Sequence, residues 1–76
     1  MDAVQLLANF CYDEMNDEQL TAVAEYETEK WKPTIDEMIK SDMTKKEMED
    51  FVHTLWHNYE IANETEDMLY KYIQSA

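Results

Sequence analysis

Apolar residues recur along the chain at spacings of three and four, which is the pattern of amphipathic helices. The pattern predicts a helix over about residues 3–15, in which Cys11 falls on the apolar stripe and is expected in the core. It predicts further helices over about 17–31 and 35–41, separated because Pro33 disfavours helical geometry at Lys32. The helix that begins near Lys45 has the strongest period of all.

Helix starts are marked by a repeated local motif. A capping box places Ser, Thr, Asp or Asn three residues before Glu or Gln, so that each side chain accepts a hydrogen bond from the other residue's backbone. The spacing predicts four such starts: Asp2 with Gln5, Asn16 with Gln19, Thr34 with Glu37, and Thr44 with Glu47. Apolar residues on both sides of the Asn16 and Thr44 positions add hydrophobic staples to two of them.

The path of the chain after Ala62 has two interpretations. If the helix continued unbroken, Glu66 would fall in the middle of its apolar stripe, so we favour a break near residues 63–66 with Asn63 as a further cap. The alternative is one long helix whose second apolar face meets a partner subunit. The expected fold class is all-α, a small compact bundle of four to five short helices in a single acidic domain, 1–76.

Charge is the most informative property of the composition. The chain has 18 acidic residues, six lysines and no arginine, a formal net charge of −12. Residues 1–29 hold eight acids and no base, whereas residues 30–46 hold five lysines and three acids. Such a charge favours association with positively charged surfaces and disfavours direct contact with nucleic acid or anionic membranes. An apolar content of 45% argues for a folded chain despite this acidity.

Acidic positions cluster at residues 13–18, 25–29, 47–50 and 60–67. Carboxylates held along rigid helices can imitate the closely spaced phosphates of nucleic acid and so occupy a basic groove. The plain alternative is a solvated face that serves solubility. The residues expected to bind a basic partner are Asp13, Glu14, Asp17, Glu18, Glu25, Glu29, Glu49, Asp50, Glu60 and Glu64.

Catalytic and cofactor chemistry finds little support in the sequence. His53 and His57 share a helix face and could bind a metal ion, but both point away from the apolar stripe, so surface histidines are the favoured interpretation. We expect no metal, no cofactor and no enzyme activity. A single cysteine, no long apolar stretch and no basic flank at the N-terminus lead us to expect a cytoplasmic protein.

Together these features predict a protein-binding inhibitor, a nucleic-acid mimic that blocks the basic surface of a nucleic-acid-binding enzyme or complex. In size, charge and helicity the chain resembles small phage-encoded inhibitors such as anti-restriction and anti-CRISPR proteins, although it shares no motif with them. The alternative is a helical adaptor that docks or dimerises through a hydrophobic C-terminal face, with Met68 and Tyr72 as its first contacts.

Overall fold

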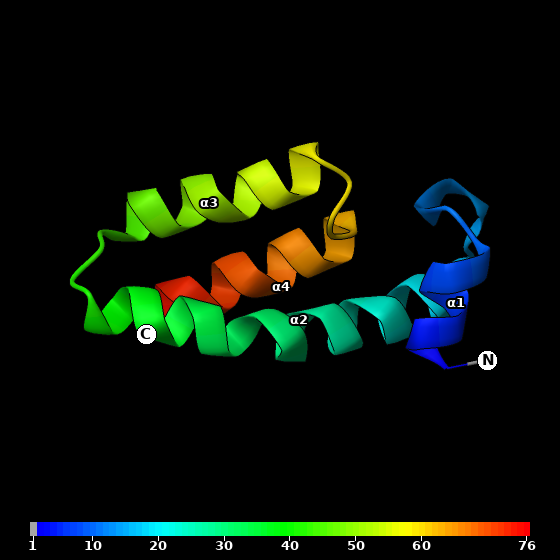
Figure 1. Cartoon of the computed structure of the whole chain (residues 1–76), viewed down its shortest axis with the longest axis horizontal. Coiled ribbons are helices and arrows are strands. Elements are labelled where there is room, and N and C mark those ends of the chain that lie inside the picture. The colour runs from blue at the N-terminus through cyan, green and yellow to red at the C-terminus, as the bar shows by residue number, and fades with distance from the viewer. Residues whose placement is uncertain (1) are drawn as a thin grey trace.

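The longest element of the fold is α2, Asp17–Lys40, and the other helices are arranged around it (Figure 1). The computed structural model describes residues 2–76. The chain runs from α1 (Ala3–Asn9) through a short 3-10 turn, η1 (Tyr12–Glu14), into α2, then α3 (Lys45–His57) and α4 (Asn63–Gln74). No strand occurs in the described residues, and the predicted all-helical fold is confirmed.

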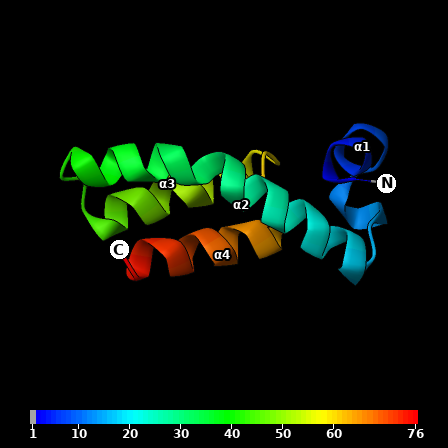
Figure 2. The same ribbon diagram turned by 90° about the horizontal axis from the view of Figure 1, so that it is seen from below.

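Two hydrophobic clusters hold these helices together. The larger joins α3 and α4 to the second half of α2, and its buried members include Ile35, Val52 and Leu69. The smaller joins α1 and η1 to the first half of α2 around Leu6 and Val23. The helices α2, α3 and α4 form a three-helix bundle, and α1 and η1 lie at the end farthest from the C-terminus (Figures 1 and 2). None of the helices in residues 2–76 has the length and apolarity needed to cross a membrane.

Three of the four predicted capping boxes are confirmed. The side chains of Asp2, Asn16 and Thr44 each accept a hydrogen bond from the backbone N–H three residues later. In return, the backbone N–H of each of these residues donates to the Gln or Glu side chain at that later position. These starts were predictable because a capping box involves only four consecutive residues. The fourth prediction, Thr34, is wrong, since Thr34 lies inside α2.

The predicted division at Pro33 is wrong for a related reason. Proline removes one backbone hydrogen bond from a helix, yet α2 continues through Pro33 without ending. Its exposed position leaves the proline ring in solvent, while buried Ile35 and half-buried Trp31 pack into the larger cluster on either side. Burial of these flanking side chains thus outweighs the local preference, and the two predicted helices are one.

The predicted helix over residues 3–15 is also wrong, because α1 ends at Asn9 and the chain is extended at Phe10 and Cys11. The Asn9 side chain donates to the Gln5 carbonyl at 2.8 Å, a local bond that competes with helix continuation. The turn lets Phe10 pack against the smaller cluster, and it leaves Cys11 exposed instead of in the core.

The expected break in the C-terminal region is confirmed, slightly earlier than predicted, and the single long helix is excluded. The α3 helix ends at His57 and α4 begins at Asn63. Tyr59 adopts a left-handed φ of 61°, and Glu60 N–H donates to the Leu55 carbonyl at 2.9 Å, which is a Schellman turn. Asp42 holds the same left-handed position after α2, with a φ of 60°.

Candidate functional site

A buried carboxylate connects three parts of the chain. Glu27, on α2, is only 3% exposed, although the sequence places it in a cluster of surface acids. Its Oε1 accepts hydrogen bonds from Ala62 N at 3.0 Å and from Thr65 Oγ1 at 2.7 Å. Its Oε2 accepts from the Tyr12 hydroxyl at 2.7 Å. Glu27 therefore fixes η1 and the start of α4 to the middle of α2.

This arrangement explains how α4 begins without a side-chain cap of its own. Ala62 occupies the N-cap position, so the predicted Asn63 cap is wrong. Glu27, from another helix, instead accepts from the backbone N–H of Ala62, the bond that a Glu or Gln side chain at the third helical position accepts in a capping box. Its charge lies at the end of α4 where the helix dipole favours negative charge. A sequence signal for its burial exists, because Glu27 follows Val23 by four residues and precedes Trp31 by four on the apolar stripe of α2.

The fold gathers acidic residues from two distant segments at one end of the molecule. We define the acidic end as the six exposed carboxylates of η1, the first turn of α2, the α3–α4 turn and the first turn of α4. Glu27 brings these segments together, because η1 and the start of α4 bind the same carboxylate. The acidic end consists of Asp13, Glu14, Asp17, Glu18, Glu60 and Glu64.

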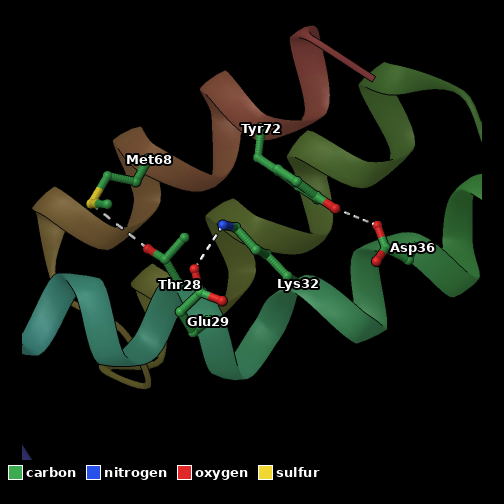
Figure 3. Close-up of polar contacts among 6 residues, drawn as sticks. All are labelled: Thr28, Glu29, Lys32, Asp36, Met68 and Tyr72. Carbon is green, nitrogen blue, oxygen red and sulfur yellow. Dashed lines mark hydrogen bonds and ion pairs between the residues drawn. The ribbon is translucent and has the colours of Figure 1, made fainter.

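The six lysines all lie between the middle of α2 and the opposite end of the molecule. Lys32 pairs with Glu29 at 2.8 Å, and Lys40 pairs with Glu37 at 3.5 Å (Figure 3 shows the first). Lys71 pairs with Asp67 at 3.1 Å. Within residues 2–76, no lysine pairs with a carboxylate of the acidic end. The acidic end therefore keeps its charge uncompensated.

The remaining acids that the sequence proposes for a partner lie apart from this end. Glu29 is already paired with Lys32, and Glu25 is exposed further along α2. Glu49 and Asp50 lie near the start of α3, where Glu49 accepts from the Gln74 side chain at 3.3 Å, close to the end of α4. Six of the ten proposed acids thus belong to the acidic end, and the other four lie outside it.

Helix electrostatics account for only part of the acidic end. Asp17, Glu18 and Glu64 lie in first turns, where a carboxylate is worth about 0.3–1 kcal/mol through the helix dipole. Asp13 lies in a 3-10 turn and Glu60 lies just past the C-terminal end of α3. These two carboxylates therefore lie outside the first turn of any α-helix, where the dipole contribution is largest.

A groove opens beside the acidic end, with α1 and η1 forming one wall and the α3–α4 turn the other. Its volume is about 680 Å³, which lies within the range of small ligand sites. Asp13, of the acidic end, is among its lining residues, and the other lining side chains are mostly apolar or aromatic. The groove therefore joins apolar surface to the uncompensated carboxylates.

Comparison with protein-family models, curated proteins and solved structures gave no match.

Met68 and Tyr72, proposed for the adaptor alternative, contact α2 within the molecule (Figure 3). The Met68 sulfur accepts from the Thr28 hydroxyl at 3.7 Å, and the Tyr72 hydroxyl donates to Asp36 Oδ1 at 2.5 Å. Lys32 Nζ lies 5.3 Å from the centre of the Tyr72 ring, a cation–π distance. Both side chains are half-buried, so much of their surface already serves the contact between α2 and α4.

The two histidines have separate surroundings. His53 Nδ1 lies 3.0 Å from Glu66 Oε2, and its ring is 5.3 Å from that of Trp56. His57 lines the groove instead. Across residues 2–76, no three His, Cys, Asp or Glu side chains gather as a metal site would require. The hydrogen bond and charge of Glu14 raise the pKa of the Cys11 thiol, which makes this exposed cysteine a weak nucleophile at neutral pH.

Proposed function

We propose that this chain is a protein-binding inhibitor whose acidic end occupies a basic nucleic-acid-binding surface of a target protein. The observation that carries the proposal is the segregation of charge: six exposed carboxylates lie on the segments around one end of the bundle, and no lysine of the described residues pairs with any of them. Ordinary solvated helix faces mix both signs and gain stability from pairs at i,i+4. An uncompensated end is better explained by a cationic partner.

The rigidity of the array supports the same function. Glu27 holds η1 and the α4 start on α2 through three hydrogen bonds of 2.7–3.0 Å. Segments that are fixed before binding lose less backbone entropy when their carboxylates meet lysine and arginine side chains. The inhibitor would act by competition, with its carboxylates in the places of phosphates. Long-range attraction would make association fast at low salt and weaker as ionic strength rises.

The test is capture from a cell extract followed by competition. The immobilised chain is expected to retrieve a basic nucleic-acid-binding protein at low salt and to release it when duplex DNA or RNA is added. The chain should in turn prevent the captured protein from binding nucleic acid. Salt-insensitive capture of a neutral protein, unaffected by nucleic acid, would contradict the proposal and favour the adaptor.

Two matched variants locate the surface. One changes four carboxylates of the acidic end to amides, Asp13→Asn, Glu14→Gln, Asp17→Asn and Glu18→Gln, and should weaken inhibition strongly. The control removes the same number of charges elsewhere, through Glu37→Gln, Asp42→Asn, Glu47→Gln and Asp67→Asn. The control should inhibit nearly as well as the wild type, because it leaves the acidic end unchanged.

A further inference from the structure

The groove beside the acidic end has two walls that the fold holds at a fixed separation. One wall presents Leu7, Phe10 and Tyr12, and the other presents Trp56, Tyr59 and Ile61. The Tyr12 hydroxyl and Ala62 N–H, one from each side, both donate to buried Glu27. The groove is therefore built into the fold and does not depend on a chance contact between mobile loops.

Tyr59 is the exceptional residue of this groove. Its side chain is 84% exposed, more than any other large hydrophobic residue that the structure describes. Its backbone φ of 61° is the left-handed conformation that a Schellman turn usually assigns to glycine. Asp42 occupies the equivalent position after α2, where a short polar side chain tolerates this conformation better. The Tyr59 ring at the groove rim is thus neither buried within the fold nor favoured by the left-handed backbone conformation of its residue.

The charges around the groove select the occupant. Asp13 lines one wall, and Glu60 and Glu64 lie next to lining residues of the other. No lysine or arginine occurs in residues 2–29 or 47–70, which contain every lining residue. A second copy of this chain, with its own charge of −12, would be repelled, as would an anionic lipid surface. The complementary occupant is a cationic polypeptide segment.

We propose that the groove anchors a basic segment of the target protein through one apolar or aromatic side chain flanked by arginine or lysine. The apolar side chain lies between the walls, near Phe10 and Trp56. Tyr59 covers it at the rim and offers its ring face to a neighbouring guanidinium. Asp13, Glu60 and Glu64 pair with the flanking cations. This proposal rests on the proposed function, and it adds a hydrophobic anchor to what would otherwise be recognition by charge alone.

The test uses three short synthetic peptides, each labelled for fluorescence anisotropy. The first has arginines on both sides of a central Phe-Leu pair, the second replaces that pair with serines, and the third replaces the arginines with glutamines. We expect the first peptide to bind at least about tenfold more tightly than either control. Methyl and indole NMR signals of Leu7, Trp56 and Ile61 should shift on binding, whereas those of Ile73, at the other end of the bundle, should not.

Tyr59→Gly is the decisive variant, because glycine suits the left-handed position and the fold should persist. It should weaken binding of the first peptide by about tenfold. Tyr26→Ala, which removes another exposed tyrosine outside the groove, should leave binding unchanged. Equal binding of the first and second peptides, or wild-type binding by the Tyr59→Gly variant, would overturn the proposal.

The same peptides separate failure of the groove from failure of the proposed function. If the serine peptide binds as well as the first, and the four-amide variant of the acidic end loses both, the groove proposal fails while recognition by charge stands. If the first peptide binds in the groove but the captured target still binds nucleic acid, the groove stands and the inhibitor proposal fails.

Discussion

The Tyr12 hydroxyl donates a 2.7 Å hydrogen bond to the buried carboxylate of Glu27, across fifteen positions of sequence. Through this bond the N-terminal segment, which packs in a separate hydrophobic cluster, is joined to the residue that also holds the start of α4. Together with the bonds from Ala62 and Thr65, this contact holds η1 and the start of α4 against one carboxylate. Both the acidic end and the groove depend on it.

Replacement of Glu27 should therefore destabilise the fold more than replacement of any acid at the acidic end. Glu27→Ala would leave the Tyr12 hydroxyl, the Ala62 N–H and the Thr65 hydroxyl without their acceptor, and we expect a loss of about 3 kcal/mol or more. Tyr12→Phe removes one donor and should cost about 1 kcal/mol. Urea denaturation followed by circular dichroism measures both. A Glu27→Ala variant as stable as Glu25→Ala would contradict this role.

The left-handed backbone conformation of Tyr59 leads to a separate prediction about the free energy of unfolding. Left-handed geometry costs a non-glycine residue about 1–2 kcal/mol, partly offset by the greater unfolded-state entropy of glycine. Tyr59→Gly should thus be as stable as the wild type or up to about 1 kcal/mol more stable. Asp42→Gly should gain less, because Asp tolerates the conformation. A marked loss of stability in Tyr59→Gly would mean that its ring supports the fold instead of a partner.

Replacement of two threonines tests whether α2 is continuous, as in the structure, or divided into two helices, as the sequence suggests. Thr44 accepts a hydrogen bond from Glu47 N at 3.1 Å as the N-cap of α3, so Thr44→Ala should cost about 1 kcal/mol. Thr34, with the same spacing to Glu37, lies inside α2, and Thr34→Ala should change stability by no more than about 0.5 kcal/mol. Equal losses in thermal or urea denaturation would indicate a helix start at Thr34.

Alkaline pH should destabilise the fold through its bonded tyrosines. Burial, followed by the hydrogen bond to Glu66, raises the pKa of Tyr70 from 10.0 to about 12. Burial and the Glu27 bond also raise the pKa of Tyr12. An unfolded tyrosine loses its proton first, so stability is fully present below pH 10 and is lost as the pH rises toward 12. Tyr70→Phe should show a smaller loss over this range in denaturation experiments; an unchanged pH profile would contradict the assignment.

Local motifs made much of the fold predictable. The capping boxes at Asp2, Asn16 and Thr44 need only neighbouring residues, and the rotation of the apolar stripe after Ala62 predicted a break. Pro33 failed as a helix end because burial of Ile35 and Trp31 in the larger cluster is a tertiary effect. The end of α1 failed because the apolar spacing continues through Cys11, although the chain turns to bring Phe10 against α2.

The candidate site was only partly visible in the sequence. Clusters of acids could be counted, but their arrangement around one end depends on hydrogen bonds that Glu27 accepts from residues 35 and 38 positions away. Its residue type predicts an exposed position for Glu27, whereas its spacing of four from Val23 and Trp31 on the apolar stripe of α2 predicts a buried one. The groove could not be predicted from the sequence, because its lining residues come from two segments, 7–13 and 56–63, that are far apart along the chain.

The most direct test of the central claim is the salt dependence of binding to the captured target. Affinity measured at several ionic strengths should fall steeply for the wild type and for the control amide variant, and the slope should be shallower when Asp13, Glu14, Asp17 and Glu18 are amides. Added nucleic acid should compete with all three. Equal slopes for the two amide variants, or simultaneous binding of nucleic acid and the chain to the target, would show that the acidic end is not the inhibitory surface.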